Sequence, residues 1–169
     1  MARGYEVQGD VQLMLRYESE TPEHEEFLYG LYAETRSDEP TFYGWREEDK
    51  DAFLRMQYKL RTRSYRLQYP LAEQRIILYE GNWAGALLTS ESEDAISLID
   101  VALLPPYRNR GIGTDIIKQV QETATARHKA VKLHVLTDNR ARRLYERLGF
   151  IAKEEHFPYM SMTWRSPNQ

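Results

Sequence analysis

Two arginines and two glycines lie close together where an apolar segment gives way to a helical pattern. The run Ile99–Gly113 reads IDVALLPPYRNRGIG, with Arg108 and Arg110 just before Gly111 and Gly113. Glycine lets the backbone come close to a ligand, and the first N–H groups of a helix lack partners and favour negative charge. Arginine adds charge-assisted hydrogen bonds to phosphate. The spacing predicts a phosphate site at a helix N-terminus, and a purely structural turn is the alternative.

Two common nucleotide motifs do not fit this loop. A P-loop has the pattern GxxxxGK[ST], but Ile116 stands five residues after Gly111 and no lysine follows in register. The Rossmann fingerprint needs a third small residue where Ile116 stands, and no acidic residue ends the next strand to hold a ribose. Asp115, in the first helical turn, favours the helix dipole but would repel a nearby phosphate.

Three side chains are candidates for proton transfer. His134 lies in the middle of an apolar strand pattern, and an ordinary histidine pKa of about 6.5 suits a general base. Asp100 is the lone charge in another apolar strand, where a carboxylate needs a partner or a raised pKa. Tyr145 lies on an apolar helical stripe. The structural alternatives are a solvent-facing histidine, an aspartate bound to backbone N–H groups and a core tyrosine ring.

The elements that must position these residues follow from the hydrophobic period. Alternation predicts strands over residues 11–17, 75–79, 83–89, 97–104, 131–136, 150–155 and 159–164. Helical spacing predicts helices from Thr21 to about Arg36, over 48–66 and 113–128, and a short one capped by Asn139 and ending at Gly149. The second helix should bury Phe53, Met56, Gln57 and Leu60. The order β-α-α-β-β-β-α-β-α-β-β predicts one mixed α/β (α+β) domain over residues 1–169.

Composition excludes several classes of protein. Hydrophobic residues make up 41% and charged residues 29% of the chain, near the average for globular domains. The absence of cysteine excludes disulfides, thiolate zinc sites and a cysteine nucleophile. The four histidines are scattered, so we expect no metal. Neither a membrane span nor a signal peptide is evident, and we expect a cytoplasmic protein.

The segment from about Arg75 to Trp164 resembles the GCN5-related N-acetyltransferase (GNAT) superfamily. Arg108-x-x-Gly111-x-Gly113 is similar to that family's pyrophosphate loop. Residues 133–150, LHVLTDNRARRLYERLGF, are similar to its second signature, whereas residues 1–70 match only in element order. The resemblance implies a mixed, mostly antiparallel sheet of six to seven strands with about four helices. It also implies acetyl-CoA as co-substrate and direct transfer to an amine, with no covalent enzyme intermediate.

The resemblance assigns roles residue by residue. Val101, Ala102 and Leu103 would pair with the pantetheine arm where the strand separates from residues 131–136, and Asn139 would bind the same arm. The pyrophosphate would lie on Arg108, Asn109, Arg110, Gly111, Ile112, Gly113 and Thr114. Tyr145 would protonate the CoA thiolate and also contact the cofactor. His134 lies where some relatives carry a glutamate thought to act as the base, and Asp100 is the other candidate.

Charge is unevenly distributed and suggests the second substrate. Residues 18–51 hold twelve acidic and three basic residues, and residues 105–147 hold ten basic and four acidic ones. We expect an acceptor pocket formed by the first helix pair, the aromatic loop 37–47 and the last hairpin. A cationic acceptor follows: a small amine, a polyamine, or a peptide lysine or N-terminus. Solvated helix faces would explain the same charges.

Two other functions use the same features. One is a non-catalytic acyl-CoA-binding or sensor domain. The other is a nucleic-acid-binding module on residues 55–75, where arginine and tyrosine alternate, but net acidity makes this unfavourable. We expect neither nucleic acid nor membrane as a partner, and a monomer or homodimer.

Overall fold

The computed structural model describes residues 14–167, and these divide into two compact units. The first unit comprises residues up to Leu87 together with Val101–Leu104, and the second comprises Leu88–Asp100 and the residues from Pro105 on. Seven strands pair in the order β1-β2-β3-β4-β5-β7-β6. No helix of the described part is long and apolar enough to cross a membrane.

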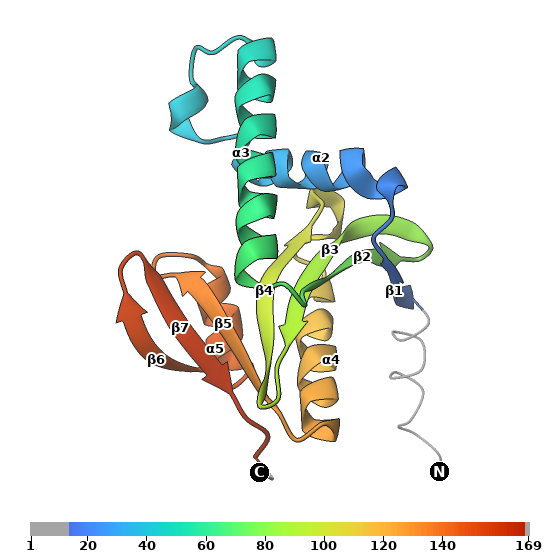
Figure 1. The fold of residues 1–169 in the computed structure, drawn as a ribbon, viewed down its shortest axis with the longest axis vertical. Helices are drawn as coiled ribbons and strands as arrows, with labels where there is room; N and C mark the ends of the chain where they lie inside the picture. Colours follow the sequence, from blue (N-terminus) through green and yellow to red (C-terminus); the bar gives the residue numbers. More distant parts are fainter. Residues whose placement is uncertain (1–13, 168–169) are drawn as a thin grey trace. The chain divides into compact units, whose positions relative to one another are not determined.

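The elements follow the predicted order (Figure 1). The strands are β1 (Leu15–Ser19), β2 (Glu73–Tyr79), β3 (Asn82–Glu91), β4 (Ala95–Leu103), β5 (Ala130–Leu136), β6 (Ile151–His156) and β7 (Tyr159–Trp164). The α-helices are α2 (Glu25–Arg36), α3 (Glu47–Gln68), α4 (Ile112–Ala126) and α5 (Ala141–Arg147), and the short 3-10 turns are η1 (Pro22–His24), η2 (Pro40–Phe42) and η3 (Pro105–Tyr107). The strand predicted over residues 11–17 begins at Leu15 among the described residues, and residues 11–13 lie outside them.

In the first unit, α2 lies across α3 (Figure 1). Tyr29 and Tyr32 of α2 and Leu54 of α3 form a buried cluster with Phe42 from the loop between the helices. A second buried cluster joins Leu28 and Leu31 to Ile76 and Ala86 of the strands. The predicted inner face of α3 is wrong in part. Met56 is 50% exposed and Leu60 is 59% exposed, and Leu54 is the buried residue.

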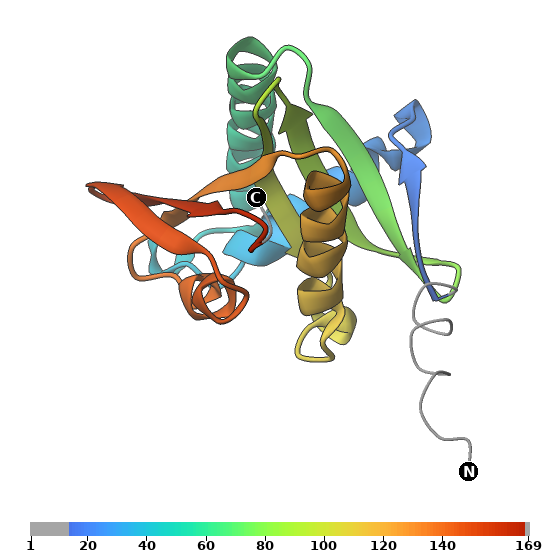
Figure 2. The same cartoon turned by 90° about the horizontal axis from the view of Figure 1, so that it is seen from below.

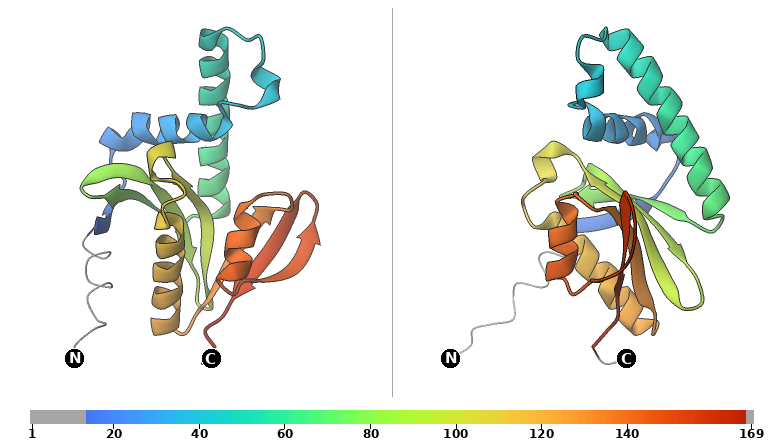
Figure 3. Two further views of the ribbon diagram at one scale, coloured as in Figure 1. Left: turned by 180° about the vertical axis from the view of Figure 1, so that it is seen from behind. Right: turned by 90° about the vertical axis from the view of Figure 1, so that its left-hand side faces the viewer.

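In the second unit, the predicted stripe of α4 is buried: Ile116, Ile117, Val120 and Ala124. The short helix α5 lies along β5 beside the β6–β7 hairpin (Figures 2 and 3). Gly149 has φ +87° at the end of α5, which confirms the predicted left-handed C-cap.

Candidate active site

Strands β4 and β5 are parallel, and the ladder between them covers only part of their length. Their ladder joins residues 95–98 of β4 to residues 130–133 of β5, with Leu98 opposite Leu133 as the last pair in the described part of the chain. Both strands continue beyond this pair, β4 to Leu103 and β5 to Leu136. In the second unit, β5 keeps its antiparallel partner β7 as far as Leu136. Among the described residues, no β4–β5 pair lies beyond Leu98 and Leu133.

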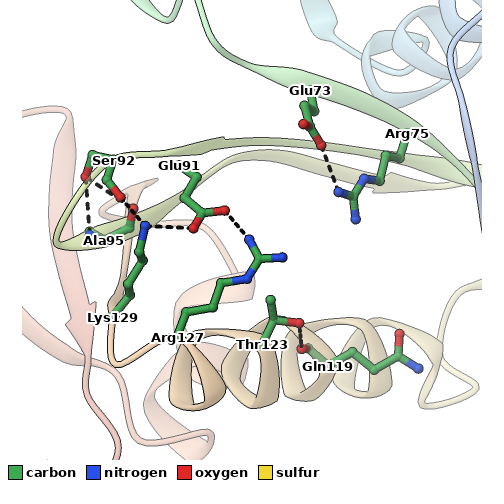
Figure 4. A network of polar contacts seen from close by, with 9 residues as sticks. All are labelled: Glu73, Arg75, Glu91, Ser92, Ala95, Gln119, Thr123, Arg127 and Lys129. Atoms are coloured by element: carbon green, nitrogen blue, oxygen red, sulfur yellow. Dashed lines mark hydrogen bonds and ion pairs between the residues drawn. The ribbon is translucent and has the colours of Figure 1, made fainter.

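The other end of this strand pair is held closed by charged side chains (Figure 4). Glu91, at the end of β3, forms ion pairs with Arg127 and with Lys129, whose Nζ lies 2.7 Å from a Glu91 carboxylate oxygen. Lys132 of β5 pairs with Asp94 at 3.2 Å. These side chains lie next to the intact part of the ladder. The ion pairs therefore stabilise the end at which the two strands are hydrogen-bonded.

The loop before α4 has the backbone shape expected of an anion site. Gly111 (φ +80°) and Asn109 (φ +56°) are left-handed, and no side chain caps the helix that Gly111 begins. A Cβ added at Gly111 or Gly113 would meet no atom within 4 Å, so the backbone there is open. The Arg110 guanidinium donates to the Pro106 carbonyl at 3.3 Å. Positive φ, an uncapped helix start and two exposed arginines suit a diphosphate.

The other predicted loop residues differ in exposure. Arg108 is exposed, and its backbone N–H donates to the Pro105 carbonyl at 3.2 Å, which closes the turn. Ile112 is buried and anchors the helix start, whereas Thr114 is half-buried. Ile112 therefore offers its backbone rather than its side chain to a ligand.

Tyr145 is a buried phenol close to a carboxylate. Its side chain is 8% exposed, and its ring packs edge-on against Phe150 with ring centres 5.5 Å apart. Burial, and secondly the negative charge of Asp100, raise the pKa of Tyr145 to about 12. The hydroxyl is therefore protonated near neutral pH, as a general acid must be. Tyr145 and Asp100, both candidates for proton transfer in the sequence analysis, therefore interact.

Asn139 and Gly149 fix the ends of the helix that carries Tyr145. The Asn139 side-chain oxygen accepts a hydrogen bond from the Ala141 N–H at 2.9 Å. At the other end, the Phe150 N–H donates to the Tyr145 carbonyl at 3.0 Å. The N-cap residue of α5 is Arg140, one residue beyond the predicted Asn139, and Asn139 itself is exposed.

His134 and Asp100 lie on opposite faces of the sheet. Leu98 and Leu133 are a register pair, so their side chains share a face, and Asp100 is two residues beyond Leu98 on that same face. His134 follows Leu133 directly and points to the other face, where it is exposed. The two candidate bases are therefore not brought together.

Val101, Ala102 and Leu103 lie in the first unit, at the end of β4, and are half-buried. A Cβ added at Gly85 of β3 would lie 2.1 Å from the Ala102 carbonyl oxygen. The glycine therefore makes room for the backbone of β4 at this point. The Leu104 N–H donates to the Ala84 carbonyl at 2.8 Å, which ties the end of β4 to β3.

Several positioning residues were not predicted from the sequence. The ion pairs of Glu91 join residues 36 and 38 positions apart, and no local pattern marks such pairs. Gln121 of α4 is 8% exposed and donates to the Leu148 carbonyl at 2.8 Å, so it ties α4 to the end of α5. A polar residue on an otherwise apolar helical stripe was the available signal for Gln121.

The acidic character of residues 18–51 is partly neutralised within the first unit. Arg55 pairs with Glu26 and Asp51, both at 3.0 Å. Arg36 pairs with Glu39 at 2.7 Å, and further pairs are Arg46 with Asp49 and His24 with Glu18. No group of three or more potential metal ligands is assembled within residues 14–167.

Comparison with known proteins identifies the family. Residues 12–150 match the model of the acetyltransferase (GNAT) family. A search of curated proteins finds no match.

Solved structures share the fold at low sequence identity. PaiA N-acetyltransferase of Thermoplasma acidophilum, in complex with coenzyme A, has a TM-score of 0.65 and 18% identity over 90% of this chain and 99% of that chain. Spermidine N-acetyltransferase of Vibrio cholerae has a TM-score of 0.60 and 15% identity, over 90% and 94%. A GNAT family acetyltransferase of Elizabethkingia anophelis with acetyl-CoA bound has a TM-score of 0.57 and 14% identity, over 90% and 98%.

These findings confirm the predicted fold, a mixed sheet with seven strands in the GNAT arrangement. They also confirm the predicted enzyme class, an acyltransferase with acetyl-CoA as co-substrate. The predictions of a single domain and of individual site residues stay predictions. Because the family model spans residues 12–150, well over half of the chain, this protein belongs to the acetyltransferase (GNAT) family.

Proposed function

We propose that the protein transfers the acetyl group of acetyl-CoA directly to a primary amine of a cationic acceptor. The acceptor class comprises small amines, polyamines, and the lysine or N-terminal amine of a peptide. The observation that carries the proposal is the end of the β4–β5 ladder at Leu98 and Leu133, the point at which the family resemblance implies that the thioester enters. The likeness to a spermidine N-acetyltransferase supports a polyamine among the candidates.

In this proposal, acetyl-CoA contacts three parts of the chain. The backbone of Val101, Ala102 and Leu103 pairs with the pantetheine arm, and Asn139 offers it an amide. Residues 108–114 bind the pyrophosphate, supported by the left-handed Gly111 and the open backbone at Gly113. Acetyl-CoA supplies an activated carbonyl carbon and a thiolate leaving group.

During the transfer, one side chain of the protein accepts a proton from the amine and another donates a proton to the sulfur. The amine nitrogen forms a bond to the acetyl carbon while the carbon–sulfur bond breaks, so the amine loses a proton and the sulfur gains one. Tyr145 donates its phenolic proton to the sulfur, and its raised pKa keeps that proton in place beforehand. Asp100 contributes to that raised pKa, so we assign it to positioning the proton of Tyr145 and assign the base to His134.

Two measurements test the proposal. Calorimetry with CoA should show binding that weakens at least tenfold in Arg108→Gln, because a charge-assisted contact to phosphate is lost. An exposed lysine on β6, changed as Lys153→Gln, is the matched control and should leave CoA affinity unchanged. Absence of heat at millimolar CoA would count against the cofactor site.

The second measurement follows thiol release with a panel of amines. Cationic acceptors should be preferred, and His134→Gln should lower kcat about a hundredfold or more. Asp100→Asn should lower kcat less. If Asp100→Asn abolishes turnover and His134→Gln does not, the assignment of the two side chains is reversed. A preference for neutral amines would remove the argument from charge.

A further inference from the structure

The first unit contains a cavity of about 740 Å³ whose lining includes none of the residues assigned to acetyl-CoA or to proton transfer. One wall is the turn between β1 and α2, with Glu20, Thr21 and Glu25. The other wall is the C-terminal half of α3, and the cavity lining there consists of Tyr58, Lys59, Thr62, Arg63, Arg66 and Leu67. This volume lies within the range typical of small-ligand sites.

Charges of opposite sign face this cavity without neutralising each other. Among residues 14–167, no ion pair involves Glu20, Glu25, Lys59, Arg63 or Arg66. The N-terminal half of α3 is different, because Arg55 there has two carboxylate partners. Lys59, Arg63 and Arg66 therefore differ from Arg55, because they have no ion pair among the described residues.

Helix dipoles explain only part of this arrangement. Glu25 lies in the first turn of α2 and Arg66 in the last turn of α3, where such charges are favoured. Lys59 and Arg63 lie in the interior of α3, and Glu20 precedes α2, so the dipole accounts for none of these three. The spacing 59, 63, 66 puts the basic residues on one helix face, in a row about 10 Å long at 1.5 Å per residue.

Tyr58 connects the two walls. Its ring is half-buried and packs against the cluster of Leu28, Leu31 and Ile76, which makes it a rigid part of the cavity lining. Burial raises the pKa of the Tyr58 hydroxyl, and the charges of Glu20 and Glu25 raise it further, whereas Thr62 and Arg61 lower it. The acidic wall is therefore near the ring, and the basic row continues along α3 beyond it.

We propose that this cavity binds a short acidic peptide by its free N-terminus, with the ammonium on Glu20 and Glu25 and the carboxylates on Lys59, Arg63 and Arg66. An extended tripeptide spans about 10 Å, which matches the basic row. The exposed side chain of Leu67 and the ring of Pro22 offer apolar contacts to its backbone. A ligand with positive charges alone would be repelled by the three basic residues. A ligand with negative charges alone would leave the carboxylates of Glu20 and Glu25 without a partner.

The test is a calorimetric titration of the full chain, without acetyl-CoA, with the peptide Gly-Glu-Glu. Its N-acetylated form and Gly-Gln-Gln are the comparison ligands. Because a peptide amine is also a candidate acceptor, variants of the cavity residues assign the binding to this cavity. We expect Gly-Glu-Glu to bind, and the other two to bind at least tenfold more weakly, since each loses one set of charge-assisted contacts.

Two variants assign the contacts to the walls. Arg63→Gln should weaken both Gly-Glu-Glu and its N-acetylated form about tenfold, whereas Glu25→Gln should weaken only the form with a free ammonium. Lys153→Gln on β6 is the control for net charge and should bind like the unchanged protein. Lys59→Gln replaces Arg63→Gln if circular dichroism shows that the latter misfolds. The proposal is overturned if no peptide binds at millimolar concentration, if the acetylated peptide binds equally well, or if neither Arg63→Gln nor Glu25→Gln weakens the binding of Gly-Glu-Glu.

Discussion

Replacing Tyr145 by phenylalanine separates its chemical role from its role in packing. The ring packs against Phe150 and is 8% exposed, and phenylalanine keeps this contact. We expect the free energy of unfolding at pH 8 to change by about 1 kcal/mol or less. Loss of the proposed acid should lower kcat by about a hundred- to ten-thousandfold while CoA affinity stays within about twofold. Tyr69→Phe, in the first unit, is the matched control and should retain full activity.

The raised pKa of Tyr145 gives the same variant a second, pH-dependent signature. With a pKa of about 12 in the folded state, about 97% of the phenol keeps its proton at pH 10.5, against about 24% for an unperturbed tyrosine. The thiol-release rate, corrected for spontaneous hydrolysis of acetyl-CoA, should therefore not fall up to pH 10.5. A fall of about fourfold with a midpoint near pH 10, absent in Tyr145→Phe, would refute the reasoning.

The sign of the linked stability follows from the same shift. Because the pKa of Tyr145 is raised on folding, its contribution is fully present below pH 10 and is lost as pH rises from 10 to about 12. A shift from about 10 to about 12 corresponds to about 3 kcal/mol. Urea unfolding at pH 9 and pH 11 should show a loss of stability in the unchanged protein that is smaller in Tyr145→Phe.

Three further predictions concern the backbone and the charged cluster. Gly85→Ala should destabilise the fold by about 1–3 kcal/mol in urea unfolding, because its Cβ would lie 2.1 Å from the Ala102 carbonyl oxygen; unchanged stability would contradict that contact. Gly111→Ala should cost about 1 kcal/mol at φ +80°, whereas Gly113→Ala, inside the helix and in open space, should stabilise by a few tenths to about 1 kcal/mol. Both should weaken CoA binding, and equal stabilities would count against the left-handed assignment. The lysine and arginine partners of Glu91 lower its pKa, so its ion pairs contribute stability that is present above pH 4.5 and lost in acid. Glu91→Gln should remove this contribution. The free energies of unfolding at pH 7 and pH 3 should therefore differ less in this variant than in the unchanged protein.

Local patterns predict the elements around the site well. The apolar stripe of α4 repeats at helical spacing, and a single pattern of this kind suffices when one face is buried. The C-cap at Gly149 and the turn at Glu80 and Gly81, both with positive φ, follow equally from local chemistry. In each case the decisive interactions join residues within a few positions of one another.

Long-range contacts determine the features of the fold that the sequence did not predict. Helix α3 carries apolar residues on more than one side, and only the cluster with Tyr29, Tyr32 and Phe42 selects Leu54 over Met56 and Leu60 for burial. The acidic segment 18–51 likewise looked like a recognition surface. Part of its charge is neutralised by arginines such as Arg55. Hydrophobic periodicity does not predict which carboxylates such an arginine contacts.

Where the ladder ends also depends on residues distant in sequence. The intact part of the β4–β5 pair lies next to Glu91 and its basic partners, so ionic contacts hold the strands where they are already hydrogen-bonded. Past Leu98, strand alternation puts Asp100 on the face where it interacts with Tyr145 and puts His134 on the other. The proposed acid and the proposed base therefore lie on opposite faces of the sheet, because Tyr145 interacts with Asp100 and His134 follows Leu133 in the strand alternation.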